Sequence, residues 1–329
     1  MELEPNLSSY DIAHIFNLCR PQEPYLQARR AKRWGIPLVM STIYWNMYEV
    51  NRASARYHLG KRILGRFALD EDFKSRLLGI IDNLMVRDPG YALRLQRNIG
   101  LRRQQLEILD KCRILLPNST AEAEIIRKDF NCYKPCHIVP NAINPSIFKK
   151  RGKSLDSQRP PYILSVGNIT IRKNQLSLMK AIKDLGLHLV LVGRSGDPPK
   201  SYSDECLREC KRNNFEYLGE LPQEDIIPLY YGAKVHALVS WVETPGLSNL
   251  EAGLCGCNIV STEVGGTREY FQSFAWYCDP GDINSIKDAI RRAFEAPKSS
   301  YLSKHIKKCF TWDRAAQETF NAYVQALNA

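Results

Sequence analysis

Two glutamates could do chemistry in the segment Val235 to Tyr270, which reads VHALVSWVETPGLSNLEAGLCGCNIVSTEVGGTREY. Glu243 precedes a proline-glycine turn, and Glu251 follows that turn, eight positions later. Carboxylates accept hydrogen bonds from hydroxyl groups, and sugars and riboses present such hydroxyls in pairs. If both side chains overlook one crevice, they can hold a polyol. The alternative is that Glu243 caps a helix and that Glu251 pairs with a basic neighbour on a solvated face.

The elements around this turn predict how the glutamates are positioned. Val235 to Ser240 is an apolar run typical of a buried strand, Leu247 to Cys255 has helical spacing, and Ile259 to Thr262 is a second buried strand. Open α/β sheets bind ligands at the carboxyl ends of strands, where Glu243 is expected. The backbone amides of Gly246, Leu247 and Ser248 at the helix start favour an anion such as phosphate. Polyol and phosphate together indicate a sugar nucleotide.

A second candidate region is the run SVGNITIRKNQ, residues 165–175. Gly167 ends a predicted strand, and Lys173 follows six positions later, just before a predicted helix. A lysine there can reach a pyrophosphate as a point charge, although a solvated lysine has the same pattern. The pair Gly193-Arg194 ends the next predicted strand and could contact the nucleotide, but it is an equally good loop sequence.

The motifs E-x-x-G-L-x-x-L-E, A-G-x-C-G-C-x-I-V and G-G-x-x-E resemble the donor-site signature of retaining glycosyltransferases of family 4 (glycosyl transferases group 1). The resemblance implies the GT-B fold, an α/β fold of two Rossmann-like domains facing across a cleft. It implies that Glu243 faces the transferred sugar and that Glu251 holds the ribose hydroxyls. It also implies that the amides of Gly246 to Ser248 cradle the phosphates and that Lys173 binds the pyrophosphate.

The same resemblance places a cation directly after Gly167, where this sequence has Asn168. Arg172 is a nearby replacement for that cation. The reaction implied is transfer of a glycosyl group from a nucleoside diphosphate sugar to an acceptor hydroxyl, with retention at the anomeric carbon. Lys173 and the backbone amides would stabilise the departing diphosphate, so we expect no metal and no other cofactor. The resemblance also implies a role in the synthesis of a cell-surface polysaccharide or glycoconjugate.

Two other functions stay open. A GT-B nucleotide-sugar epimerase would use the same nucleotide crevice without an acceptor. A noncatalytic, nucleotide-sugar-binding partner of another transferase is the second alternative. A dehydrogenase is excluded because the sequence has no G-x-G-x-x-G between a strand and a helix.

Composition sets further bounds on the protein. No apolar run approaches the ~18 residues of a membrane-spanning helix, and no signal peptide precedes Asp11, so we expect a soluble, cytoplasmic protein. The 10 cysteines contain no C-x-x-C pair and are expected to be reduced thiols. Nucleic-acid binding would rest on charge alone, without a recognition motif, and is not expected.

The net charge of +11 is concentrated in the first half of the chain. Residues 1–150 hold 24 Lys and Arg against 15 Asp and Glu, whereas the remainder holds 22 against 20. Basic residues alternate with apolar ones in two helical runs between Tyr48 and Asp110. This pattern indicates an anionic or lipid-linked glycan acceptor, and a peripheral contact with the anionic inner face of the membrane. An ordinary helix with a charged outer face has the same pattern and is the commoner case.

The predicted domain organisation follows the alternation of strands and helices. Residues 1–148 form an N-terminal Rossmann-like domain on the acceptor side, 149–161 a linker, 162–310 a C-terminal nucleotide-sugar domain, and 311–329 a helix that packs back on the first domain. Only about four strands precede Asn141, so the opening unit of the first domain is expected to be incomplete. The strand end Ser41 to Trp45 has no histidine, although the resemblance places a sugar-facing one there. Trp312 is expected to anchor the last helix in the core.

Overall fold

A computed structural model describes residues 6–57, 98–149, 160–197 and 199–329 of the chain. These residues form two compact units. Unit 1 comprises residues 6–46, 98–140 and 316–329, and unit 2 comprises 47–57, 141–149, 160–197 and 199–315. Residues 141–148 lie in unit 2 rather than in the first domain, because Ile143 and Phe148 are buried in the core of unit 2. Most of the predicted linker, residues 150–159, lies outside the described residues.

Unit 2 contains one six-stranded parallel sheet with the strand order β6-β5-β4-β7-β8-β9. The four inner strands of the sheet are almost wholly buried, which suits strands covered by helices on both faces. The chain builds outward from β4 to β6 and then returns to place β7 on the other side of β4. This reversal makes the carboxyl ends of β4 and β7 the switch point at which open α/β sheets bind ligands. The strands are β4 (Tyr162–Val166), β5 (His188–Val192), β6 (Glu216–Tyr217), β7 (Val235–Leu238), β8 (Asn258–Thr262) and β9 (Ala275–Cys278).

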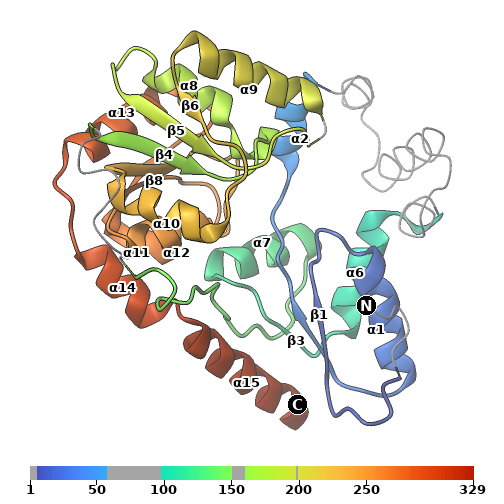
Figure 1. The fold of residues 1–329 in the computed structure, drawn as a ribbon. Coiled ribbons are helices and arrows are strands. Elements are labelled where there is room, and N and C mark those ends of the chain that lie inside the picture. Colours follow the sequence, from blue (N-terminus) through green and yellow to red (C-terminus); the bar gives the residue numbers. More distant parts are fainter. Residues whose placement is uncertain (1–5, 58–97, 150–159, 198) are drawn as a thin grey trace. The chain divides into compact units, whose positions relative to one another are not determined.

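Helices cover both faces of the unit 2 sheet (Figure 1). One face carries α8 (Gln175–Ile182), α9 (Lys200–Arg212) and α13 (Ile283–Glu295). The other face carries α10 (Gln223–Gly232), α11 (Leu247–Leu254), α12 (Thr267–Phe271) and α14 (Tyr301–Cys309). Two short 3-10 helices, η1 (Ile171–Lys173) and η2 (Gln272–Phe274), complete the set described for this unit. The alternation predicted from residue 162 onward is confirmed, while α12 and α14 were not predicted.

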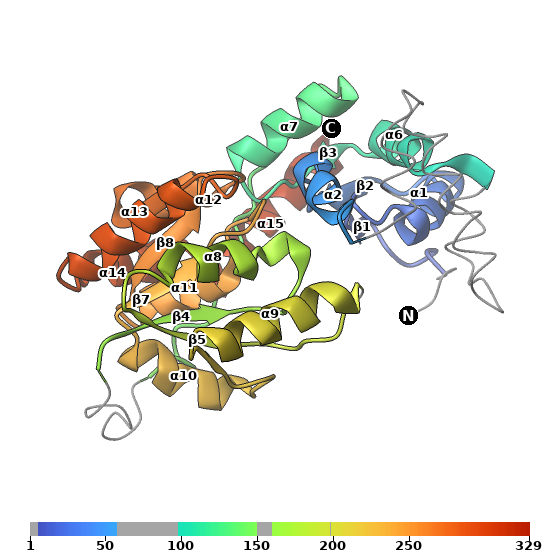
Figure 2. The same ribbon diagram turned by 90° about the horizontal axis from the view of Figure 1, so that it is seen from above.

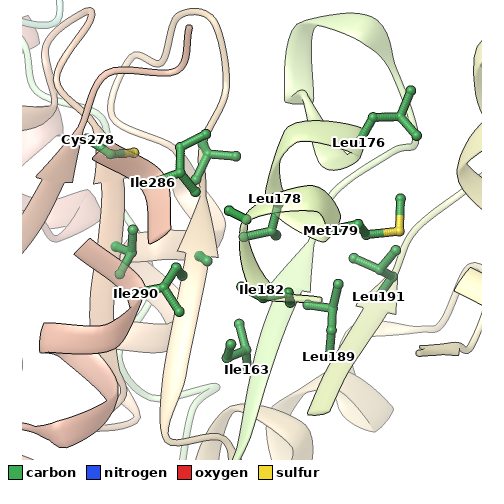
Figure 3. Close-up of a cluster of buried hydrophobic side chains, with 14 of the residues drawn as sticks. Ile163, Leu176, Leu178, Met179, Ile182, Leu189, Leu191, Cys278, Ile286 and Ile290 are labelled. Carbon is green, nitrogen blue, oxygen red and sulfur yellow. The ribbon is translucent and has the colours of Figure 1, made fainter. Parts of the chain in front are cut away.

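The core between the sheet and the α8, α9 and α13 layer consists of interlocking aliphatic side chains (Figure 3). Ile163 and Leu189 of adjacent strands meet Ile182 of α8, and Ile290 of α13 packs beside them. Burial of one such side chain stabilises the fold by about 1.5 to 3 kcal/mol. This rigid layer fixes the loops at the carboxyl ends of the strands.

The short helix α2 (Tyr48–Ser54) and the turn that follows it belong to unit 2, although the sequence predicts this helical stretch to be part of the first domain. The Tyr57 hydroxyl donates a hydrogen bond to Glu205 of α9 at 2.7 Å. The ring of Tyr57 packs edge-on against Tyr202, at a centroid distance of 5.4 Å. Helices α8 and α9 lie side by side above the strands (Figure 2). Residues 58–97, which carry much of the two basic helical runs, lie outside the described residues.

Unit 1 contains a parallel sheet of three strands with the order β1-β2-β3 in its described residues. An isolated backbone bridge between Leu115 and Cys136 adds one residue pair beside β3. One face of the sheet packs on three helices and the other on the last helix of the chain. The elements are β1 (Ala13–Phe16), β2 (Leu38–Ser41), β3 (Ile114–Leu115), α1 (Gln22–Arg33), α6 (Leu101–Lys111), α7 (Thr120–Phe130) and α15 (Trp312–Asn328).

Helix α15 packs on the sheet of unit 1 through small residues. Ala322 and Ala326 are fully buried against Val39 and Ile114, and their small side chains let the helix approach the strands closely. Trp312 is 63% exposed, so the prediction that it anchors the helix in the core was wrong. The residues of α15 that pack on the sheet lie further along the helix, from Ala322 onward.

A buried carboxylate fixes the carboxyl end of β2. Ser119 and Glu122 have the spacing of a capping box, and the Ser119 hydroxyl accepts from the Glu122 backbone N–H at 3.1 Å. The Glu122 carboxylate accepts from the Thr42 hydroxyl at 2.5 Å and from the Tyr44 N–H at 2.6 Å. Between them, Ile43 has φ +45° and a side chain that is 45% exposed. This left-handed backbone is strained for a β-branched residue.

None of the helices that the structure describes is both long and apolar enough to span a membrane.

Candidate functional site

Glu243 lies just beyond the carboxyl end of β7, in the loop that leads to α11. Its backbone N–H donates to the Val264 carbonyl, and its own carbonyl accepts from the Gly266 N–H, both at 3.1 Å. Gly265 has φ +114°, and a Cβ atom there would collide with the Glu243 carbonyl oxygen. The Gly265-Gly266 pair of the sequence motif therefore lets the β8–α12 loop pack directly on the backbone of Glu243.

The Glu243 side chain is buried between two cations. The carboxylate oxygen Oε1 lies 2.5 Å from Nζ of Lys173 and 3.3 Å from a guanidinium nitrogen of Arg172. The Ser240 hydroxyl donates to the same oxygen at 2.8 Å. Burial alone would raise the pKa of Glu243, but the nearby Lys173 and Arg172 outweigh it and hold that pKa below its usual value. Glu243 is therefore ionised, and it bonds to these groups rather than capping α11.

Lys173 reaches Glu243 from η1, which follows the end of β4. Its aliphatic stem passes over Gly167, where a Cβ atom would lie 3.4 Å from Cε of Lys173. A Cβ atom at Gly193 would collide with the Gly167 carbonyl, so the ends of β4 and β5 need a glycine at position 193 to approach this closely. Two cations beside one carboxylate leave one net positive charge, which favours an anionic ligand.

The amino terminus of α11 lies beside the Glu243 carboxylate. Gly246 is its N-cap residue with φ +86°, and a Cβ atom there would lie 3.5 Å from Oε2 of Glu243. The first N–H groups of a helix have no intrahelical acceptor, so those at the start of α11 can donate to an anion. The Ser248 hydroxyl donates to the Val166 carbonyl at 2.9 Å and ties the helix to the end of β4. Leu247, at the first helical position, is half exposed.

A buried polar network beneath α11 was not predicted from the sequence. Nε2 of His236 accepts from the Val166 N–H at 3.2 Å, so the ring proton is assigned to Nδ1, which donates to the Asn249 side chain at 2.7 Å. The Asn249 amide in turn donates to the Ser261 hydroxyl at 3.2 Å. Burial lowers the pKa of His236 to about 4 and keeps it neutral. The network joins β4, β7, β8 and α11 under the site.

Glu251 occupies the second turn of α11 and contacts α10. The Tyr230 hydroxyl donates to Oε2 of Glu251 at 2.8 Å, and the Gln223 amide donates to Oε1 at 3.3 Å. Burial raises the pKa of Glu251, while the hydrogen bonds from Tyr230 and Gln223 partly oppose that shift. Its partners are thus a tyrosine and a glutamine rather than a basic neighbour. Neither partner was named from the sequence, because no local spacing links α10 to α11.

The two remaining candidates lie at the carboxyl ends of β4 and β5. The Asn168 carbonyl accepts from the Gln175 amide at 2.9 Å. The Ile169 N–H donates to the Arg194 carbonyl at 2.8 Å, which joins the two loops. The Arg194 side chain is more than half exposed and pairs with Asp197 at 3.0 Å. Arg194 is therefore separate from the cluster formed by Lys173, Arg172 and Glu243.

Within the described ranges, no three His, Cys, Asp or Glu side chains are grouped as ligands of a metal ion. The groups that the site presents are two cations, an ionised carboxylate and a helix amino terminus. Such a cluster can bind a phosphorylated ligand and stabilise negative charge that develops on it.

Residues 146–308 match the family model of glycosyl transferases group 1. O-antigen chain mannosyltransferase B of Escherichia coli is 28% identical over 179 residues, which cover 49% of this chain and 45% of that protein. N-acetylgalactosamine-N,N'-diacetylbacillosaminyl-diphospho-undecaprenol 4-alpha-N-acetylgalactosaminyltransferase of Campylobacter jejuni is 28% identical over 214 residues, covering 62% of this chain and 57% of that one. The chain thus spans about half the length of these curated relatives.

Solved structures share the fold across nearly the whole chain. Sucrose-phosphate synthase from Thermosynechococcus elongatus superposes with a TM-score of 0.70 at 16% identity, covering 96% of this chain and 73% of that one. HepE from Anabaena, solved in complex with UDP-glucose, gives a TM-score of 0.66 at 15% identity, covering 97% and 80%. The matched residues 146–308 contain Lys173, Glu243 and Glu251, and both units have parallel sheets. Residues 146–308 therefore belong to the glycosyl transferases group 1, and the chain has the GT-B fold.

Proposed function

We propose that this protein transfers a glycosyl group from a nucleoside diphosphate sugar to an acceptor hydroxyl, with retention at the anomeric carbon, as in family 4. One observation carries the proposal. The Glu243 carboxylate, at a strand end, lies 2.5 Å from the Lys173 ammonium and beside the amino terminus of α11. Cations and helix amides suit a diphosphate, and an ionised carboxylate suits a sugar ring that gains positive charge.

In the proposed reaction the bond between the anomeric carbon and the diphosphate oxygen breaks. Negative charge then grows on that oxygen, and Lys173, Arg172 and the amides of Gly246 to Ser248 stabilise it. The acceptor oxygen bonds to the anomeric carbon on the same face of the sugar, and its proton goes to the departing diphosphate. Because the ionised Glu243 holds Lys173 in place before the donor arrives, little reorganisation is needed during the reaction.

Glu251 has the proposed role of holding the ribose. Its carboxylate already accepts from Tyr230 and Gln223, and each carboxylate oxygen has a further lone pair for a ribose hydroxyl. Burial raises the pKa of this group. Nucleotide affinity should therefore fall as the pH falls toward that raised pKa, because a protonated Glu251 is a weaker acceptor.

The acceptor is proposed to be an anionic or lipid-linked glycan. The excess of basic residues in positions 1–150 supports this choice, and one relative carries a diphospho-undecaprenol acceptor in its name. A peripheral contact with an anionic membrane is part of the same proposal. Co-sedimentation with anionic and neutral vesicles at low salt tests this contact. Equal binding to both kinds of vesicle would show that the basic residues do not attract the protein to an anionic membrane.

The decisive experiment is a mass-spectrometric screen of nucleotide sugars for turnover, with wild type and Glu243→Gln compared. The variant keeps the size of the side chain and removes its charge. We expect turnover to fall by about tenfold or more, which is about 1.4 kcal/mol per factor of ten, while nucleoside diphosphate affinity stays nearly constant. Glu263→Gln is the matched control, because Glu263 forms an exposed pair with Arg268 at 3.1 Å. The anomeric configuration of the product, read by NMR, tests retention.

The outcomes separate the alternatives. Binding of a nucleotide sugar without transfer to any acceptor extract would favour a noncatalytic partner. Release of an epimer or a free sugar without an acceptor would favour an epimerase. Metal independence is a further proposal, and the tract Asp70-Glu71-Asp72, which could hold a metal, lies outside the described residues. Activity that is lost with a chelator and restored by magnesium or manganese would contradict it.

A further inference from the structure

Lys173 is followed by a residue with an unusual conformation. Asn174 is 5% exposed, has φ +58°, and is the N-cap residue of α8. Its backbone N–H donates to the Ile171 carbonyl at 3.1 Å and closes η1. Asparagine and glycine tolerate this left-handed backbone better than other residues. The turn that presents Lys173 therefore depends on the residue directly after it.

The Asn174 side chain ties that turn to two distant segments. Its amide nitrogen donates to the Val239 carbonyl at 3.1 Å, just beyond β7, and to the Pro280 carbonyl at 2.9 Å, between β9 and α13. Both amide hydrogens are thus used on buried carbonyls. A second link runs from the Trp241 N–H to the Arg172 carbonyl at 2.9 Å. The segment that carries both cations is therefore held on the strand that leads to Glu243.

We propose that Asn174 is a positioning residue that holds the Lys173 ammonium at the diphosphate site. This role rests on the proposed function, because it presumes that Lys173 contacts a diphosphate. A lysine side chain is long and flexible, so its contribution depends on where its backbone is anchored. Glu243 holds the ammonium end, and Asn174 holds the backbone end. Glycine can reproduce the backbone of Asn174, but it cannot supply the two donors.

Two variants separate the contribution of the Asn174 backbone conformation from that of its side-chain hydrogen bonds. Asn174→Gly keeps the left-handed conformation and removes both hydrogen bonds to Val239 and Pro280. Asn174→Asp keeps the conformation and shape, and it turns a carboxylate oxygen toward the two carbonyls instead of two donors. If Asn174→Gly fails to fold, Asn174→Asp provides the same comparison. Thermal unfolding and circular dichroism identify the variants that keep the fold.

The readout is the preference for a nucleoside diphosphate over the matching monophosphate, measured by calorimetry. UDP with UMP, GDP with GMP and ADP with AMP are tested on wild type, and the pair that binds most tightly is used. We expect Asn174→Gly to lose about fivefold or more of the diphosphate preference, while monophosphate affinity stays within about twofold. Damage to the fold alone would weaken both ligands equally and leave their ratio unchanged.

A double-mutant cycle assigns the effect to Lys173. In a Lys173→Met background, Asn174→Gly should change the diphosphate preference no further, because the group that it positions is gone. Asn131→Gly is the matched control, since Asn131 also has a left-handed backbone, φ +49°, at an exposed helix end in unit 1. An unchanged preference in Asn174→Gly, or an equal loss in the Lys173→Met background, would overturn the role of Asn174. A wild type that binds no nucleotide would instead overturn the proposed function on which that role rests.

Discussion

Each unit of this protein buries a glutamate where a strand end meets a helix, and the two carboxylates have opposite surroundings. Glu243 in unit 2 contacts Lys173 and Arg172, and these cations lower its pKa against the effect of burial. For Glu122 in unit 1, burial raises the pKa, and the neutral donors Thr42, Asn118 and Tyr44 only partly oppose the rise.

The difference indicates two uses of the same side chain. A buried carboxylate that fixes a turn needs only donors of hydrogen bonds, and Glu122 has three of them from the backbone and a hydroxyl. A carboxylate that must stay charged beside a ligand needs cations, which also give the site its affinity for anions. On this basis we assign the proposed reaction chemistry to unit 2 and regard the Glu122 cluster of unit 1 as structural.

The largest expected effect comes from removing the Lys173 ammonium, the nearer of the two cations beside Glu243. Lys173→Met should lower turnover by about 10² to 10³, or about 3 to 4 kcal/mol, because the diphosphate loses a charged donor. It should also lower the free energy of unfolding, since the buried Glu243 then keeps Arg172 as its cationic partner and only the Ser240 hydroxyl besides. Steady-state kinetics and chemical denaturation measure the two effects. Lys183→Met, at the exposed end of α8, is the control. Turnover within twofold of wild type would contradict the proposal that Glu243 and its cations serve the reaction while Glu122 is structural.

The buried His14 of unit 1 should make the stability of the protein depend on pH. Burial lowers the pKa of His14 from 6.5 to about 4. The unfolded chain therefore binds a proton below pH 6.5 that the folded chain does not, and stability falls as the pH drops from 6.5 to 4. The shift of about 2.5 units corresponds to about 3 kcal/mol.

His14→Gln isolates this contribution, because Glu122 and Glu251 have raised pKa values that act in the opposite direction over part of the same range. The difference in unfolding free energy between wild type and variant, measured from pH 7 to pH 4 by denaturation, should shrink by about 3 kcal/mol. A constant difference would show that folding does not lower the pKa of His14.

A smaller effect is expected at the proposed ribose site. Glu251→Ala removes a charged acceptor and should weaken nucleoside diphosphate binding by about 1.5 to 3 kcal/mol. Calorimetry measures it, and Tyr230→Phe serves as a companion because it removes only the hydroxyl that bonds to Glu251. Unchanged affinity in Glu251→Ala would remove Glu251 from the site.

The smallest effect is expected from changing Glu122, the buried glutamate of unit 1. Glu122→Gln replaces one accepting oxygen by an amide that faces N–H and O–H donors, and should lower the free energy of unfolding by about 1 to 2 kcal/mol. Because we regard the Glu122 cluster as structural, nucleotide affinity should not change. A selective loss of nucleotide affinity, with stability intact, would contradict that distinction.

Sequence periodicity was sufficient to predict most of unit 2. Most of the strands from β4 to β9 lie in short apolar runs separated by segments with helical spacing, so most elements could be found from their own residues. The turn at Gly246 and the glycine pair at Gly265 were also visible, since only glycine permits such close backbone approach.

The partners of the site residues could not be predicted in the same way. Lys173 and Glu243 are 70 positions apart, and Tyr230 meets Glu251 only because α10 and α11 pack on the same face of the sheet. His236 lies inside an apolar run, and only the fold brings Asn249 and the Val166 N–H to its two nitrogens. The Trp312 prediction failed because helical spacing does not tell which residues of α15 face the strands.

The left-handed backbone of Ile43 has a consequence for how the chain can change. A β-branched residue in this conformation costs on the order of 1 to 3 kcal/mol, and the hydrogen bonds of Glu122 to both neighbouring residues hold it there. Relieving this strain at position 43 should therefore raise the free energy of unfolding. A replacement such as Ile43→Asn, which tolerates this backbone, could offset a destabilising change elsewhere and let the protein accept new substitutions around its binding site without unfolding.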